Sequence, residues 1–260
     1  MTVHVAVLGK GGSGKSMLAG TLARVFARRG HRVLTLDSDL MPGLTLSLGL
    51  GTDSSAMLSE AVEKDEQGRW RLRKGIGPVR AVERFAAVGP DGLRHLQLGK
   101  LGADGRGPIM GSTNGFYQVI HRIRDVKTFS RWTIIGDLSA GPRQLAYRWT
   151  PYADTFLLVV EPSWKSALTA RRIATILRGN AGVRVLAVAN KTAGPDDDRT
   201  VEQLLGERVV ATVPTDDAVI DAERAGLAPI DHDQTSPAVR AIEELATMLE
   251  DAVAGDRRAA

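Results

Sequence analysis

The stretch VLGKGGSGKSM, residues 7–17, has the spacing G-x-x-x-x-G-K-[ST] of a loop that binds phosphate groups. It follows an apolar segment predicted as a strand (3–8) and opens an amphipathic segment predicted as a helix (16–30), which is the context that this loop requires. Loop N–H groups would point at the β-phosphate, Lys15 would reach the β and γ oxygens, and the Ser16 hydroxyl would bind Mg²⁺. We expect the phosphates to be bound by Gly11, Gly12, Ser13, Gly14, Lys15, Ser16 and Met17.

A second lysine, Lys10, lies inside the same loop. Because Lys15 already serves the phosphate tail, another ammonium group in one loop adds repulsion unless a further anion shares it. A loop that wraps one phosphate tail therefore does not explain Lys10.

Short apolar segments alternate with amphipathic ones along most of the chain. The apolar segments, predicted as strands, are 3–8, 32–37, 131–137, 155–161, 183–190 and 208–214. The amphipathic segments, predicted as helices, are 16–30, 164–178, 198–206, 216–226 and 236–253. This alternation predicts an α/β fold with a single doubly wound, mostly parallel sheet flanked by helices, the P-loop NTPase fold.

Residues 60–113 interrupt this alternation. Residues 60–85 are charged and rich in turn formers, and residues 100–115 contain five glycines. We expect a single domain, 1–260, with an irregular insertion at 60–113 that contacts a client or acts as a switch. Its basic residues would bind DNA or an acidic protein, or form a solvated hairpin, and both alternatives stay open. These residues are Arg69, Arg71, Arg73, Lys74, Arg80 and Arg84, with Trp70 among them.

Three aspartates follow predicted strands. Asp137 ends the segment 131–137 and suits a water-mediated contact to Mg²⁺, while Asp37 stands at the end of the segment 32–37 and Asp39 just past it. A carboxylate just past that strand would orient and polarise the attacking water. We expect Ser16, Asp37 and Asp137 to hold the metal ion; the alternative is that the aspartates are turn formers or helix caps.

The stretch VANKTAG, residues 188–194, indicates which base is bound. Guanine-binding loops use N-K-x-D, whose aspartate accepts from guanine N1 and N2, but Ala193 stands at that position. Asn190 can still pair with adenine through its amide. ATP is therefore favoured, and the nearby Asp196, Asp197 and Asp198 leave GTP disfavoured rather than excluded.

Composition excludes several classes of protein. The 260 residues include no cysteine, which excludes disulfides and thiolate metal sites. No apolar run approaches the ~18–20 residues of a membrane span, and the first residues lack the basic segment of a signal peptide, so we expect a cytoplasmic protein. A formal net charge of +4 permits an acidic partner or nucleic acid without requiring one.

The string KGGSGKS, residues 10–16, resembles the deviant Walker A motif of the ParA/MinD ATPases. The resemblance continues through DSDL (37–40), IIGDLSAGP (134–142), FLLVVEPSWKSALTARRI (156–173), VANK (188–191) and VPTDDAVIDAERAG (213–226). The stretches DLSAGPRQL (137–145) and VVEPSWKSALTARRI (159–173) are most similar to the CooC-like branch, ATPases that help insert nickel into carbon monoxide dehydrogenase.

The resemblance implies ATP and Mg²⁺ as cofactors and a homodimer in the ATP state. In these proteins two subunits face each other across the nucleotides, and the extra lysine of each crosses to the phosphates of its partner, as an arginine finger does. The catalytic residues implied are Lys10, Lys15 and Asp39, the last as the water-activating residue. Asp137 would be the Walker B residue, and the adenine would be held by Asn190, with Lys191 beside it, and by the loop after Pro214.

The sequence also departs from its relatives. CooC-type and nitrogenase-type members carry cysteines that bind metal at the dimer interface, whereas the approximately corresponding stretch MGSTNGF, residues 110–116, has no thiol. The five histidines lack the spacing of metal ligands. We therefore expect the switch to operate without a nickel or iron–sulfur site.

The client of such a switch is open. We favour a CooC-like ATPase that acts on a protein client, and the alternative is a ParA-like partition ATPase that binds DNA non-specifically as its ATP dimer. Membrane binding of the MinD type is not expected, because residues 238–260 contain four acidic residues near their middle and no aromatic residue.

Overall fold

Strand β1 (His4–Gly9) runs inside an eight-stranded sheet in the computed structural model, which describes residues 2–39, 43–51, 58–99, 109–146, 148–179 and 182–259. The strand order is β10-β9-β8-β1-β7-β2-β6-β5, and every pairing is parallel except that of β5 with β6. The bounds are β2 (Val33–Asp37), β5 (Ala87–Val88), β6 (Arg94–Gln97), β7 (Thr133–Asp137), β8 (Thr155–Val160), β9 (Arg184–Thr192) and β10 (Val209–Pro214).

Alternate side chains of β1 enter two separate cores, because successive side chains of a strand point to opposite faces. Val5 and Val7 belong to the core covered by α1 (Lys15–Arg28) and α10 (Pro237–Ala259). Ala6 and Leu8 belong to the other core, which is covered by α3 (Pro78–Phe85), α4 (Ile109–Ile120), α6 (Trp164–Arg178) and α7 (Pro195–Leu205). Burial on both faces explains why the central strands are continuous apolar runs.

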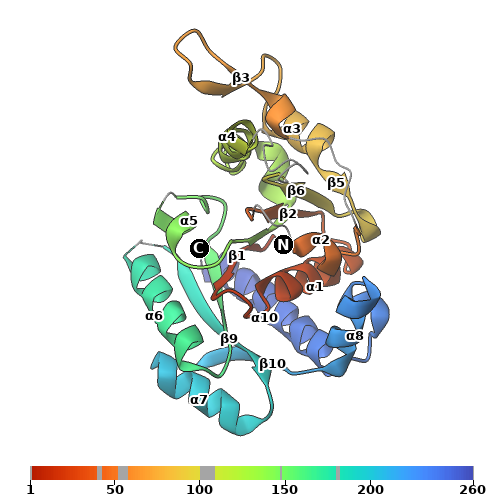
Figure 1. Cartoon of the computed structure of the whole chain (residues 1–260), viewed down its shortest axis with the longest axis vertical. Coiled ribbons are helices and arrows are strands. Elements are labelled where there is room, and N and C mark those ends of the chain that lie inside the picture. The colour runs from red at the N-terminus through yellow and green to blue at the C-terminus, as the bar shows by residue number, and fades with distance from the viewer. Residues whose placement is uncertain are drawn as a thin grey trace.

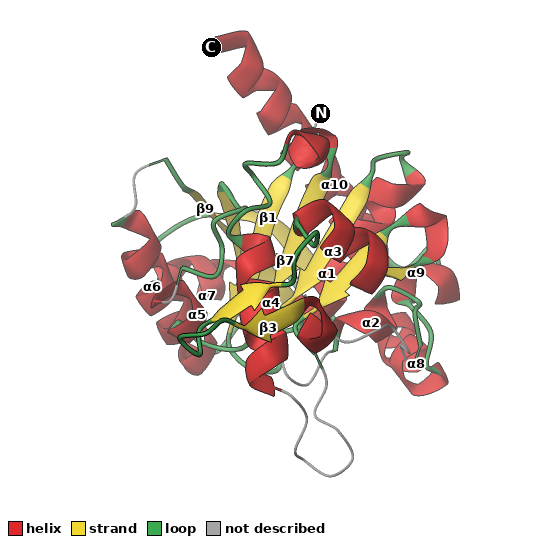
Figure 2. Cartoon of the chain, turned by 90° about the horizontal axis from the view of Figure 1, so that it is seen from above, coloured by secondary structure: helices red, strands yellow, loops and turns green. Residues whose placement is uncertain are grey.

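Four further α-helices belong to the described part of the fold. They are α2 (Leu44–Ser47), α5 (Arg143–Ala146), α8 (Asp217–Ala225) and α9 (Pro229–His232). Figure 1 shows α6 and α7 together on one flank of the sheet and α8 on the opposite flank. Figure 2 shows the end of α10 projecting beyond the sheet.

The predicted α/β fold is confirmed. The six apolar segments correspond to β1, β2, β7, β8, β9 and β10, and the helix predicted at 164–178 is α6. The bounds of the other predicted helices differ by a few residues. The largest difference is in α10, which continues to Ala259 rather than ending near residue 253.

Residues 60–113 are more regular than the expected insertion. They contain the hairpin of β3 (Val62–Lys64) and β4 (Trp70–Leu72), helix α3, the beginning of α4, and strand β6, which pairs with β2 in the main sheet. The sequence hides β6 because two of its four residues, His95 and Gln97, are polar yet buried. His95 lies 2.9 Å from the Thr35 hydroxyl of β2, which satisfies one ring nitrogen inside the sheet.

A tertiary contact requires glycine at position 136 in β7. A Cβ atom added to Gly136 would overlap the hydroxyl of Tyr152, which is almost fully buried against the strand. Gly136 directly precedes Asp137, so this packing fixes the end of β7 where the predicted metal site lies.

We expect Gly136→Ala to lower the free energy of unfolding by about 1–3 kcal/mol, because the added methyl group overfills a packed interior. Tyr152→Phe removes the overlapping hydroxyl, so the double variant should recover part of the loss. Urea unfolding of the two single variants and the double variant measures this. Additive effects would contradict the contact, since independent sites add.

Candidate nucleotide-binding site

The carboxyl ends of the parallel strands bring the predicted site residues to one edge of the sheet. In the paired register, Asp37 of β2 lies opposite Asp137 of β7, and Gly9 of β1 lies opposite Val159 of β8. Asn190 comes from the last part of the neighbouring strand β9. Functional groups from distant parts of the chain therefore surround the loop between β1 and α1, as ligand sites of open parallel sheets do.

The phosphate loop requires glycine at two positions. A Cβ atom on Gly9 would lie 2.5 Å from the carbonyl oxygen of Val159. Gly14 has φ of 89°, and its added Cβ would overlap the side-chain amide of Asn190. The loop closes on itself, since Ser13 N and Lys15 Nζ both donate to Lys10 O at 3.2 Å. The predicted loop thus forms a tight turn before α1.

Two residues of β9 support this loop from outside. Asn190 is buried, and its Nδ2 donates to Ser13 O at 2.7 Å. Lys191 Nζ donates to Gly12 O at 2.6 Å, from a backbone with φ of 58° that a residue other than glycine rarely adopts. Asn190 was expected to read the base, and the structure gives it a second task, because one N–H of its amide holds the loop while its carbonyl oxygen accepts no hydrogen bond from the described residues.

Glu161, which follows β8, joins both outer lysines of the loop. Its carboxylate lies 3.0 Å from Lys191 Nζ and 3.7 Å from Lys10 Nζ. The Lys10 side chain is 37% exposed, so this ion pair is open to solvent. Sequence reasoning did not select Glu161, although the acidic residue directly after an apolar strand is the same signal that identified Asp137. Lys10 therefore has an anionic partner in its own subunit.

The two opposed aspartates are buried with oxygens left over. Asp37 Oδ1 accepts from Asp39 N at 2.9 Å, and the Ser16 hydroxyl donates to Asp137. Asp37 Oδ2 and Asp137 Oδ1 are buried without a hydrogen-bond partner in the described part of the chain. Burial first, and then the neighbouring Asp137 charge, raise the pKa of Asp37 well above its usual range.

Burial also raises the pKa of Asp137 to about 6, although the Ser16 hydrogen bond and the Lys15 charge act in the opposite direction. Two buried carboxylates with free oxygens beside a hydroxyl are hard oxygen ligands, which suit Mg²⁺. Ser16, Asp37 and Asp137 therefore fit the expected metal site, with Asp39 beside them. No larger cluster of acidic or histidine side chains that could hold a metal ion occurs within the described ranges.

Ser38 and Gln144 tie this acidic edge together, and sequence reasoning missed both. Ser38 N donates to Asp137 O at 3.1 Å, and the Ser38 hydroxyl lies 2.9 Å from the same oxygen and 2.6 Å from Gln144 Oε1. Gln144 Nε2 returns a hydrogen bond to Ser38 O at 2.9 Å. Helix α5 is thereby fastened to the ends of β2 and β7.

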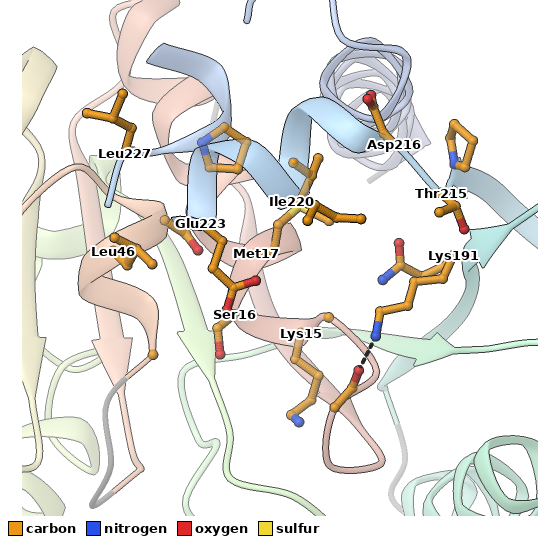
Figure 3. A pocket seen from close by; sticks show the side chains of 18 residues that line it. Lys15, Ser16, Met17, Leu46, Lys191, Thr215, Asp216, Ile220, Glu223 and Leu227 are labelled. Carbon is orange, nitrogen blue, oxygen red and sulfur yellow. Dashed lines mark hydrogen bonds between the residues drawn. The ribbon is translucent and has the colours of Figure 1, made fainter. Parts of the chain in front are cut away.

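A pocket of about 620 Å³ extends from the loop to α8. Figure 3 shows Lys15 and Lys191 on its phosphate side, and Met17 close to Ile220 of α8 farther along. Glu223 points from α8 toward the Ser16 side. Pro214 lines the pocket as expected, whereas the α8 residues were missed because a surface helix shows no such role in its sequence.

Asp216 also lines the pocket, but its carboxylate is engaged in the fold. It accepts from Ala218 N at 2.9 Å as the N-cap of α8, and from Ser236 Oγ and Ala238 N before α10. Partial burial opposes these hydrogen bonds, yet together they lower the pKa of Asp216. The residue fixes α8 over the pocket and is not available as a ligand.

Comparisons with known proteins agree with this architecture. Residues 5–230 match the family described as the CobQ/CobB/MinD/ParA nucleotide binding domain. The chain is 28% identical to the carbon monoxide dehydrogenase accessory protein CooC of Rhodospirillum rubrum, with 92% of each chain covered.

Solved structures show the same fold. The cell division ATPase MinD of Pyrococcus furiosus superposes with a TM-score of 0.74 at 21% identity, covering 96% of this chain and 99% of that one. MinD of Pyrococcus horikoshii, solved with Mg-ADP, superposes with a TM-score of 0.70 at 18% identity, covering 97% and 98%. Among the described helices, none combines the length and apolarity needed to cross a membrane.

The raised pKa of Asp137 predicts a pH-dependent stability without Mg²⁺. A carboxyl group whose pKa is raised on folding favours the folded state while it is protonated, and this contribution is lost as the pH rises through about 6. Because the unfolded carboxyl group titrates near 3.8, Asp137→Asn should raise the free energy of unfolding at pH 7.5 by about 1–3 kcal/mol and change it little near pH 3.5. Urea unfolding in EDTA measures both, with the exposed Asp196→Asn as control; equal gains at both pH values would contradict the assignment.

Proposed function

The chain belongs to the CobQ/CobB/MinD/ParA nucleotide-binding domain family, and on that premise we propose that it is an ATP-hydrolysing switch whose ATP-bound subunits pair face to face. The observation that carries the proposal is the acidic edge beside the phosphate loop. There, Asp37 and Asp137 keep buried oxygens free next to Ser16 and Lys15. A metal–phosphate complex supplies the cation that these carboxylates lack.

The remaining acceptor of Asn190 supports ATP as the nucleotide. One N–H of its Nδ2 donates to Ser13 O, and its acceptor Oδ1 is buried without a partner among the described residues. Adenine presents an amino group at C6 that donates to such an acceptor, whereas guanine presents a carbonyl oxygen that does not. A buried acceptor left unpaired weakens binding.

The catalytic roles follow from position. Ser16, Asp37 and Asp137 would hold Mg²⁺, which supplies positive charge to the β and γ oxygens when bound. Lys15 would turn from Lys10 O to the phosphates, a short movement at the same loop. Asp39, bound through its N–H to Asp37, would orient the attacking water.

Lys10 would change partners when two subunits meet. In one subunit it pairs with Glu161 at 3.7 Å, in a solvent-open geometry worth at most about 1 kcal/mol. The phosphates of a facing ATP carry several negative charges and would compete with that carboxylate. Lys10 would then stabilise the dimer and the transition state together.

Two ion pairs in the β3–β4 hairpin favour a protein client over DNA. The arginines of the β3–β4 hairpin are partly neutralised within it, since Arg69 pairs with Asp65 and Arg71 pairs with Glu63. The hairpin therefore presents less free positive charge than its sequence suggests. We propose a CooC-like maturation or remodelling role without a cysteine metal site, and a salt titration of DNA binding with and without ATP tests the ParA-like alternative.

We expect ATP·Mg²⁺ to bind at least about tenfold more tightly than GTP·Mg²⁺, a difference of about 1.4 kcal/mol. Inosine triphosphate is a matched control because it has the C6 carbonyl of guanine without the 2-amino group, so it should bind as weakly as GTP. Calorimetry measures the three affinities. Equal affinities for ATP and inosine triphosphate would contradict the proposed role of Asn190 Oδ1 in recognising the amino group of adenine.

Three loop variants separate binding from assembly. Lys10→Ala should bind ATP but lose ATP-dependent dimerisation and lower the hydrolysis rate by about 10²-fold or more, because the charge supplied across the interface is gone. Asp39→Ala should dimerise stably with ATP, and Lys15→Ala should weaken nucleotide binding itself. Light scattering on a sizing column and a phosphate-release assay measure these outcomes.

Glu161→Gln is the matched control, since it removes the resting partner of Lys10 and keeps the lysine. It should dimerise with ATP at least as well as the unaltered protein. If Lys10→Ala dimerises and hydrolyses ATP normally, the proposed action across the interface is wrong.

A further inference from the structure

Helix α6 leaves an apolar surface outside the core. Its buried side consists mainly of small and aliphatic residues, including Ala167, Ala170 and Ile173. On the other side Trp164 is 65% exposed and Leu168, one turn later, is 42% exposed. A large aromatic side chain left in water beside a leucine is unfavourable for an isolated subunit and typical of a binding surface.

The same surface is basic. Lys165, Arg171 and Arg172 are exposed around Trp164 and Leu168, and the sequence of α6 contains no acidic residue. None of the three takes part in an ion pair with the described residues. The three aspartates that begin the adjacent α7 form no ion pair with them: Asp196 pairs with Arg199, Asp197 accepts from Ala193 N, and Asp198 keeps a buried oxygen without a partner among the described residues.

We propose that this surface, formed by Trp164, Lys165, Leu168, Arg171 and Arg172, binds an acidic amphipathic segment of the protein client. Apolar residues of the segment would cover the tryptophan and leucine, and its carboxylates would meet the three cations. The positive charge without acidic neighbours selects an acidic partner, and the exposed apolar pair selects a partner with an apolar side.

The surface is connected to the nucleotide site, and to this extent the inference rests on the proposed function. Glu161, the partner of Lys10, lies three residues before Trp164. Its N–H donates to Ser166 Oγ at 3.0 Å, and Ser163 Oγ caps the helix by accepting from Ser166 N. The first turn of α6 is thereby fixed to the residue that Lys10 leaves in the ATP dimer, so client binding there can depend on the nucleotide.

The hairpin is a separate region that serves as an internal comparison. Figure 1 shows β3 at the far end of the molecule from α6. Arg69 and Arg71 are well exposed there, like the α6 cations, but each has an acidic partner. Reversing their charge changes the net charge of the protein by the same amount without altering the α6 surface.

The probe is a fluorescein-labelled amphipathic peptide of about 18 residues with leucines along one side and glutamates elsewhere. Fluorescence anisotropy with the full-length protein and ATP·Mg²⁺ should show binding, weakened at least about tenfold by Trp164→Ala and by Arg171→Glu with Arg172→Glu. Arg69→Glu with Arg71→Glu should leave the affinity unchanged. The α6 charge-reversal variant should instead bind the peptide in which lysines replace the glutamates.

Several results would overturn the proposal. They are unchanged peptide binding by the α6 variants, equal binding of the glutamate and lysine peptides by the unaltered protein, and no peptide binding at all. If duplex DNA displaces the peptide and the α6 variants also lose DNA binding, the surface binds nucleic acid instead. If the α6 variants lose ATP-dependent dimerisation, the surface is a subunit interface. ATP hydrolysis and dimerisation of the unaltered protein are measured separately, so failure of the switch itself is distinguished.

Discussion

The register between β2 and β7 sets Asp37 directly opposite Asp137 at the end of a fully buried pair of strands. Burial raises the pKa of both carboxyl groups, and the neighbouring Asp137 charge raises that of Asp37 further. A shift of one residue in either strand would turn one carboxylate to the opposite face of the sheet. The pairing therefore places two carboxyl groups that are protonated at low pH and whose charges the proposed Mg²⁺ would balance at neutral pH.

The phosphate loop takes its shape from strands that lie far away in sequence. β8 approaches Gly9 so closely that no side chain fits, and Asn190 and Lys191 of β9 hold the loop carbonyl groups of Ser13 and Gly12. The same side-chain amide has a buried Oδ1 without a partner among the described residues, and Asn190 lines the pocket. In the proposed function, phosphate binding and base recognition would share this residue, which would couple the two ends of the nucleotide.

The ion pairs around Lys10 are weak, so little free energy is needed for Lys10 to change its partner. Lys10, Glu161 and Lys191 form a chain of ion pairs at the surface, where water screens each contact. In the proposed ATP dimer, the phosphates of a partner would need to replace only one such contact to recruit Lys10, and their loss after hydrolysis would let the pair reform. The start of α6 lies beside this chain, so the exposed tryptophan and the cations near it are well placed to respond to the same exchange.

The amino-acid sequence by itself determined the phosphate loop, the alternation of strands and helices, and the aspartates at strand ends, because each is a local pattern with its own periodicity or spacing. It did not reveal β6, whose His95 and Gln97 look like surface residues until Thr35 of the neighbouring strand supplies a partner. It also did not assign Glu161 or the α8 side of the pocket. Those roles arise only when parallel pairing brings the ends of β8, β9 and β10 to one edge, since a hydrogen bond or ion pair between distant residues leaves no mark on either local sequence.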